Sequence, residues 1–228
     1  MALNKNSNMI VGLDIGTSKV VCIVGKYNNE NKLEIVALGA YPSSGLKKGV
    51  VVNIDATTDA ISKAVEQAQS MIEEKISSVF VGIAGNHIKS LNSQGAVGIR
   101  DKEVTSYDVD RVIDSAQAVS IPSDQRVLHV LPQEFVIDGQ EVSLDPLGMS
   151  GVRLEAKVHL VTCANSAIKN IEKCIKNCGL GVDGFVLEQL ASSHSILSSD
   201  EKDLGPLFRS KKIIRNNLFK FDTTLTDE

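Results

Sequence analysis

The sequence predicts an α/β fold: a mixed five-stranded sheet with helices on its faces, interrupted by a small α+β subdomain. Residues 9–40 contain strand-like runs joined by short turns. Residues 55–84 have the pattern of a helix followed by an apolar strand, and residues 165–197 that of a helix, a strand and a helix. Residues 86–163 carry separate helix and strand signals, so we assign them to an insertion.

The first two strands are predicted at residues 9–15 and 19–26, on either side of the turn Gly16-Thr17-Ser18. Apolar residues alternate with smaller or polar ones in both runs, as expected of strands with one buried face. A third strand is predicted at 33–40, after an Asn-rich turn. Sequential strands on short turns form an antiparallel meander.

A connector at residues 41–54 leads into a helix predicted at 55–74, with Asp55 as its N-cap. The nearly continuous apolar run 78–84 predicts a strand covered on both faces, which a right-handed crossover makes parallel to a meander strand. A helix at 165–178, ended by Gly179, then precedes a strand at 182–187 and a helix at 188–197.

The inserted block has one predicted helix, which begins at Thr105 with Asp108 three residues later in a variant capping box. Strands are predicted at 126–131, 134–138 and 152–163. These elements predict a compact α+β lobe at the edge of the main sheet, suited to protein contacts.

Two prolines and two histidines of the inserted block are interpreted as structural. Pro132 and Pro146 are expected to shape turns. His129 and His159 lie in predicted strands without an acidic or nucleophilic partner at a suggestive spacing. They are therefore not candidates for catalysis.

Composition argues against several classes of function. The net charge of −4, the absence of Trp and an aromatic content of 4% argue against nucleic acid as a partner. No run of 18 apolar residues and no apolar signal core occur, so a cytoplasmic location is expected. Cys22, Cys163, Cys174 and Cys178 are expected to be reduced thiols, because no second Cys or His pair completes a zinc site with the last two.

The turn after the first strand is the candidate site. Asp14 is suited to hold Mg²⁺, directly or through water, and Gly16 can take positive φ without a Cβ clash in a turn whose N–H groups can form an anion-binding concavity. Thr17 and Ser18 add hydroxyl donors, and Lys19 would balance phosphate charge. The alternative interpretation is an ordinary hairpin loop.

The sequence resembles the FtsA family of bacterial actin-like cell-division proteins. The matching stretches are VGLDIGTSKV (11–20), YPSSGLKKGVVVNID (41–55), VLHVLPQEFVIDGQ (127–140), DPLGMSGVRLEAKVHLVTC (145–163) and LEQLASS (187–193). The resemblance implies an actin and ribonuclease-H-like subdomain 1A at residues 1–85 and 164–205. It also implies an inserted subdomain 1C at 86–163.

The resemblance further implies ATP and Mg²⁺ as ligands, self-association into filaments, and contacts with FtsZ and late divisome proteins. Members tether the FtsZ ring to the inner face of the cell membrane at the division site and have at most weak ATPase activity, so an enzyme is not expected. Asp14, Gly16, Thr17 and Ser18 match the family's first phosphate loop, which Lys19 adjoins. Glu188 matches the segment that faces the γ-phosphate, where it would orient a water molecule. A Glu in the first turn of a helix is the structural alternative.

The sequence departs from the family after residue 205. No second D-x-G-x-G-T phosphate loop follows, and neither do the second lobe and the C-terminal membrane helix. The tail at 206–228 is therefore expected to be out of frame or disordered, unless its basic apolar pattern forms a membrane-surface helix. The expectation is a truncated chain that binds ATP poorly. The alternative functions are a small-metabolite kinase of the same superfamily and a pilus-assembly scaffold related to FtsA.

Overall fold

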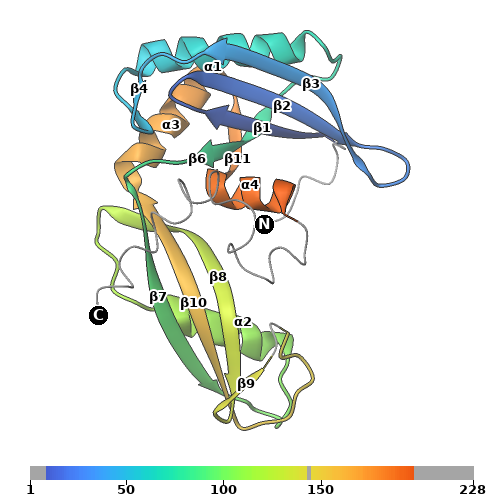
Figure 1. Cartoon of the computed structure of the whole chain (residues 1–228), viewed down its shortest axis with the longest axis vertical. Helices are drawn as coiled ribbons and strands as arrows, with labels where there is room; N and C mark the ends of the chain where they lie inside the picture. Colours follow the sequence, from blue (N-terminus) through green and yellow to red (C-terminus); the bar gives the residue numbers. More distant parts are fainter. Residues whose placement is uncertain (1–8, 143–144, 198–228) are drawn as a thin grey trace. The chain divides into compact units, whose positions relative to one another are not determined.

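The computed structural model describes residues 9–142 and 145–197, which fall into two compact units (Figure 1). Unit 1 comprises the described parts of Met1–His87 and Ser166–Glu228, and unit 2 comprises Ile88–Asn165. The boundaries predicted for the inserted subdomain, 86 and 163, lie close to those of unit 2. The predicted tail at 206–228 lies outside the described residues.

Unit 1 is built on a five-stranded sheet in the order β11-β6-β1-β2-β3. The β1–β2 and β2–β3 pairs are antiparallel, and β6 pairs in parallel with both β1 and β11. This arrangement confirms the predicted mixed sheet. The strands are β1 (Met9–Ile15), β2 (Lys19–Tyr27), β3 (Leu33–Pro42), β6 (Ser78–Ile83) and β11 (Gly181–Leu187).

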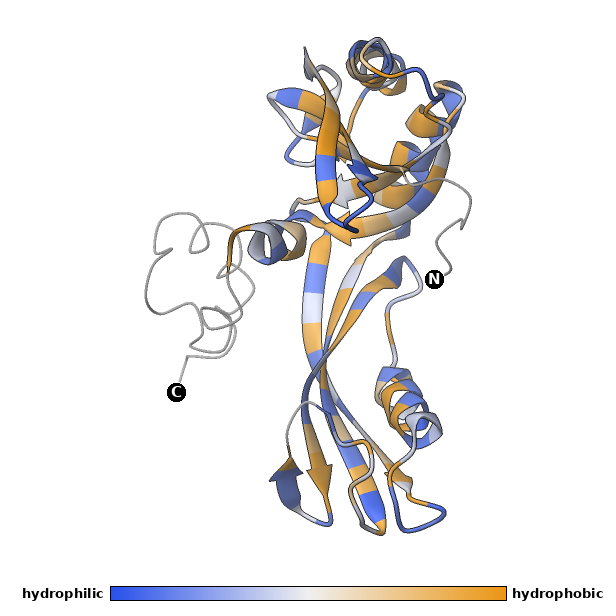
Figure 2. Ribbon diagram, turned by 90° about the vertical axis from the view of Figure 1, so that its right-hand side faces the viewer, coloured by the Kyte–Doolittle hydropathy of each residue, from blue (hydrophilic) through white to orange (hydrophobic). Residues whose placement is uncertain are grey.

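Alternation along β1 and β2 explains why these residues form strands with one buried face. Val11, Leu13 and Ile15 are buried, as are Val20 and Cys22, whereas their neighbours are more exposed. Figure 2 shows the hydropathy of each residue along these elements. The buried side chains form the core of unit 1 together with the apolar faces of two helices.

Helices α1 (Ile54–Gln69) and α3 (Asn165–Asn177) lie on one side of the sheet, and α4 (Glu188–Ile196) lies on the other (Figure 1). Small residues let α1 approach closely. A Cβ at Gly39 of β3 would lie 1.9 Å from the Ala64 carbonyl oxygen. Close approach at this point therefore requires glycine.

Two details of α1 differ from the prediction. Its N-cap is Asn53, whose Oδ1 accepts from the Ala56 N–H at 3.0 Å, and Asp55 lies within the first turn instead. The helix ends at Gln69 rather than at 74, and Met71 is exposed. Gly179, predicted to follow the end of α3, has a φ of 74°.

Unit 2 contains a four-stranded sheet in the order β7-β10-β8-β9, and α2 (Ser106–Gln117) packs on it. Two expectations were wrong. The predictions included no strand at 88–98, where β7 lies. The strands predicted at 126–131 and 134–138 are one strand. The bounds are β7 (Ile88–Gly98), β8 (Gln125–Ile137), β9 (Gln140–Val142) and β10 (Arg153–Ala164).

Pro132 lies inside β8 and does not form a turn. Its Cα pairs with Val158, and the next pair joins Glu134 to Lys157, so one residue of β8 bulges out. A proline is tolerated there because β9 pairs only with residues 135–137, which leaves Pro132 on a free edge. Pro146 does lie in a turn, where its carbonyl accepts from the Met149 N–H.

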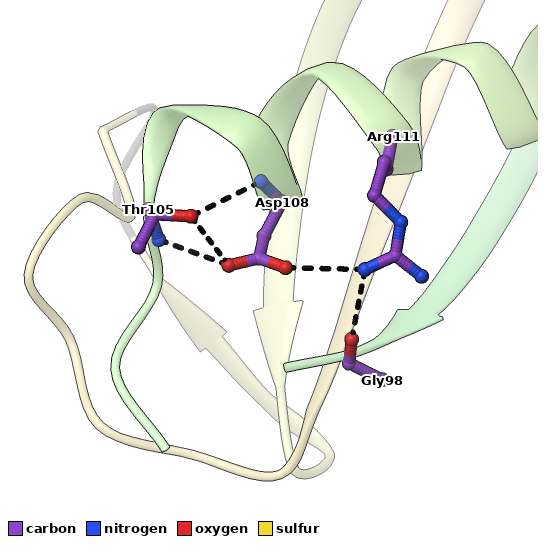
Figure 3. A network of polar contacts seen from close by, with 4 residues as sticks. All are labelled: Gly98, Thr105, Asp108 and Arg111. Atoms are coloured by element: carbon purple, nitrogen blue, oxygen red, sulfur yellow. Dashed lines mark hydrogen bonds and ion pairs between the residues drawn. The ribbon is translucent and has the colours of Figure 1, made fainter. Parts of the chain in front are cut away.

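The capping box of α2 is confirmed (Figure 3). The Thr105 hydroxyl accepts from the Asp108 N–H and donates to Asp108 Oδ2 at 2.7 Å. Arg111 donates to Asp108 Oδ1 at 3.2 Å and to the Gly98 carbonyl at 3.3 Å. Hydrogen bonds from Thr105 lower the pKa of the buried Asp108 carboxyl, with the Arg111 charge adding to the effect. The buried carboxylate is thereby satisfied.

The histidines and cysteines have structural surroundings. His159 Nδ1 lies 2.7 Å from Asn92 Oδ1 on the neighbouring strand, and burial lowers the pKa of His129. The four cysteines are free thiols. Burial raises the pKa of Cys22 and Cys178 to about 11. Thiols of this kind are unreactive.

Candidate functional site

The carboxyl ends of β1, β6 and β11 meet at one edge of the unit 1 sheet because these neighbours are parallel. Within this edge, Asp14 of β1 pairs with Gly82 of β6, and Gly82 pairs with Val186 of β11. Ligands of open α/β sheets bind outside such an edge. We call it the carboxyl edge.

The hairpin turn after Asp14 leaves two backbone donors without an acceptor in residues 9–142 and 145–197. The Gly16 N–H donates to the Lys19 carbonyl at 3.1 Å and closes the turn. The N–H groups of Thr17 and Ser18 donate to no residue that the structure describes, and both side chains are exposed. Adjacent free N–H groups with hydroxyls beside them suit an oxyanion.

Gly16 does not use the positive φ that glycine permits. Glycine suits this position because a Cβ would lie 3.0 Å from the Lys19 carbonyl oxygen. Gly16 therefore supplies space in the turn, and the N–H groups of Thr17 and Ser18 are its candidate anion donors.

Glu188 and Asp14 are brought together although they are far apart in the sequence. Glu188 is the first residue of α4, and its side chain extends over Gly82, where a Cβ would lie 3.1 Å from Glu188 Cγ. Burial raises the pKa of Glu188 to about 7, and the neighbouring Asp14 charge and a hydrogen bond with Asp14 add to the shift. At neutral pH Glu188 is therefore protonated for part of the time.

The carboxyl pair fits a hydrated divalent cation. Asp14 is exposed, so its oxygens are open to a cation that retains most of its waters. A positive charge near Asp14 would also favour the ionised form of Glu188. Lys19 is exposed at the start of β2, beside the turn.

The connector reaches the same edge, which was not among the predictions from the sequence. The Ser43 N–H donates to the Ser18 carbonyl at 3.0 Å. Gly49 lies so close to the loop after β6 that a Cβ would be 2.2 Å from the Ala84 carbonyl oxygen. Glycines at 49 and 82 were the available signal, since glycine in an apolar stretch often marks a close approach.

Comparisons with known proteins give the family. Residues 85–162 match the family model of the SHS2 domain inserted in FtsA. Over 205 residues the chain is 62% identical to the cell division protein FtsA of Pseudomonas aeruginosa. This match covers 90% of this chain and 49% of the relative. Over 197 residues it is 44% identical to FtsA of Escherichia coli K12, with 86% and 47% covered.

A solved structure supports the fold. The structure of a PilM-PilN type IV pilus biogenesis complex matches with a TM-score of 0.57 at 14% identity and covers 81% of this chain and 49% of that one. The likeness and the SHS2 match confirm the predicted actin-like architecture with an inserted subdomain. The chain spans about half the length of the curated relatives that it matches. The chain, which matches about half of each of these relatives, belongs to the FtsA family of bacterial cell-division proteins.

Proposed function

We propose that unit 1 holds the phosphates of Mg-ATP at the carboxyl edge, as part of an actin-like adaptor for cell division. The observation that carries the proposal is the turn with free Thr17 and Ser18 N–H groups beside the Asp14–Glu188 pair. Family membership supports the division role. FtsZ, late divisome proteins and further copies of the chain are the proposed partners, at the inner face of the cell membrane at the division site.

Each residue has a proposed part in binding. Thr17 and Ser18 donate N–H and hydroxyl hydrogen bonds to phosphate oxygens, and Lys19 offsets their charge. Asp14 binds Mg²⁺ through water, and the ion would neutralise part of the phosphate charge. Glu188 orients a water molecule near the terminal phosphate. Its pKa of about 7 places its change of charge in the physiological range.

The 228-residue polypeptide produced alone is expected to bind Mg-ATP weakly. Each hydrogen bond of an exposed turn contributes about 1 kcal/mol net. A few such bonds must offset an association cost of at least ~4 kcal/mol. The affinity is then no better than roughly millimolar.

We propose that the chain is not an enzyme, in contrast to a small-metabolite kinase of the same superfamily. A panel of sugars and short carboxylates with radiolabelled ATP tests this. No transfer of phosphate above the level of an Asp14→Asn variant is expected. Robust transfer to any acceptor would exclude the adaptor proposal. A pilus scaffold is disfavoured because the sequence identity is 14% to the structure of the pilus complex and 62% to a cell-division protein.

The membrane link of the adaptor is proposed to lie in the family's C-terminal helix. Among residues 9–142 and 145–197, none of the helices is long and apolar enough to span a bilayer. The basic tail, for which a membrane-surface helix is the alternative expectation, lies outside the described residues.

Nuclear magnetic resonance tests the binding site. The amide signals of Thr17 and Ser18 in the ¹⁵N-labelled chain are expected to shift in a saturable manner when Mg-ATP is added at millimolar concentrations. Asp14→Asn should weaken these shifts, while Asp183→Asn, an exposed carboxylate in β11, should not. Shifts confined to other parts of the chain, or equal shifts in both variants, would refute the site.

A further inference from the structure

The two-residue turn of the connector has a lysine at a position where such turns favour other residues. Lys48 and Gly49 form the two-residue loop between β4 (Leu46–Lys47) and β5 (Val50–Val51), and both have positive φ, 52° and 77°. Such loops favour Asn, Asp or Gly at the first position, because other side chains are strained there. The β8–β9 turn of this chain follows the preference, since Asp138 and Gly139 have φ of 49° and 85°.

A lysine in a strained position is a candidate for a role other than local stability. An asparagine at position 48 would relieve strain without any change elsewhere in the turn. Lys48 therefore lowers the stability of the turn relative to asparagine, and the surroundings of its ammonium group indicate what the charge could bind.

The connector is fixed in place at both ends. At its base, the N–H groups of Val52 and Asn53 donate to the Gly45 carbonyl at 2.8 and 3.1 Å. At its tip, Gly49 packs on the Ala84 carbonyl, as described above. A Cβ at Gly85 would in turn lie 3.0 Å from the Lys48 carbonyl oxygen. The backbone of Lys48 is therefore held against the loop that follows β6.

This position is close to the phosphate-binding turn. Gly82 pairs directly with Asp14, and Ala84 follows two residues later, which is about 7 Å along an extended chain. The hydrogen bond from the Ser43 N–H to Ser18 joins the connector to the turn on the other side. A lysine stem of four methylene groups can span such a separation.

The carboxyl edge carries negative charge, which a nearby cation would offset. The edge already carries the carboxyls of Asp14 and Glu188, and bound phosphates would add further negative charge. Lys48 is exposed and makes no ion pair within the part of the chain that the structure describes. Its ammonium group is thus available to a ligand.

We propose that Lys48 is a phosphate-binding residue, which the connector presents to the polyphosphate bound at the Asp14–Ser18 turn. The inference rests on the proposed function. It assigns to the connector a role as the second wall of the site, with the hairpin turn of β1 and β2 as the first.

The test uses Lys48→Asn, because this substitution removes the charge and improves the turn. Mg-ATP and inorganic tripolyphosphate are titrated into the ¹⁵N-labelled chain, and the dissociation constant is taken from the Thr17 and Ser18 amide shifts. Lys48→Arg is the rescue variant. Lys75→Asn is the matched control, since Lys75 is exposed and precedes the opposite end of β6.

Lys48→Asn is expected to weaken binding of both probes about two- to fivefold, the range typical of an exposed charge pair, and to reduce the dependence of binding on salt. Its thermal midpoint should equal or exceed that of the parent chain. Lys48→Arg should bind like the parent, and so should Lys75→Asn.

The outcomes separate the two proposals. If the parent chain shows the Thr17 and Ser18 shifts but Lys48→Asn binds as tightly as Lys75→Asn, the role of Lys48 is refuted and the proposed function stands. If the parent chain shows no shifts at the turn with either probe, the proposed function fails and the role of Lys48 fails with it.

Discussion

Replacing Glu188 with Gln is expected to stabilise the chain at alkaline pH and to leave its stability nearly unchanged in acid. The pKa of Glu188 is about 7 in the folded chain against an ordinary value of 4.5. As pH rises from 4.5 to 7, the unfolded chain releases this proton and the folded chain retains it. The free energy of unfolding therefore falls across this window. Glutamine stays neutral at every pH, so the variant does not undergo this fall in the free energy of unfolding.

The size of the effect follows from the shift. Each unit of pKa corresponds to about 1.4 kcal/mol, so a shift of this size gives an upper value of about 3 kcal/mol. Glu188 is half-buried and coupled to Asp14, which reduces the expected gain to about 1–3 kcal/mol above pH 7. Urea unfolding monitored by circular dichroism, from pH 4 to pH 8.5 in the presence of EDTA, measures it.

The control is Glu73→Gln, which removes an exposed carboxylate after α1. The difference in unfolding free energy between Glu188→Gln and the parent chain should grow between pH 4.5 and 7, while Glu73→Gln should follow the parent. Parallel pH profiles for the parent and Glu188→Gln would show that Glu188 is not forced into the neutral form. The burial of Glu188 beside Asp14 would then be wrong.

Substitutions at three further positions test packing and capping by urea unfolding. Gly39→Ala should destabilise unit 1 by about 1–3 kcal/mol, because the new Cβ meets the Ala64 carbonyl; an unchanged midpoint would contradict that contact. Thr105→Ala should destabilise unit 2 by about 1–2 kcal/mol, since it removes the N-cap and a hydrogen bond to buried Asp108; a loss below 0.5 kcal/mol, the lower limit for such caps, would argue against the capping box. Asn53→Ala should cost about 1 kcal/mol and Asn53→Asp much less, and equal losses would contradict the assigned cap of α1.

Much of the fold was predictable because its signals are local. Val11, Leu13 and Ile15 alternate with less buried residues, and the short turn after them permits only a hairpin. The capping box of α2 was predictable for the same reason, because Thr105 and Asp108 are three residues apart.

The errors arose where local signals compete. Asn53 and Asp55 are both good N-cap residues, and only the extended backbone of Asn53, with a φ of −140°, decides between them. The strand β7 was missed because its sequence, IKSLNSQGAVG, is polar along much of one face and contains two glycines. Pro132 suggested a turn, whereas the short partner strand leaves room for it at a bulge.

The candidate site likewise has a part that local sequence predicts and a part that depends on long-range packing. The turn at 16–18 is contiguous in the sequence and was predictable. The approach of Glu188 to Asp14 depends on the parallel pairing of β1, β6 and β11 and on the missing side chain of Gly82, none of which is local. The position of Lys48 likewise depends on the packing of Gly49 against Ala84.

Asp14 and the turn after it are proposed to hold a divalent cation together with phosphate. Mn²⁺ in place of Mg²⁺ tests this proposal most directly, because its unpaired electrons broaden the amide signals of nearby residues. With ATP present, substoichiometric Mn²⁺ is expected to broaden Asp14, Thr17, Ser18 and Glu188 first, and Asp14→Asn should abolish this selectivity. Broadening that begins elsewhere in the chain, or that persists unchanged in Asp14→Asn, would contradict the claim.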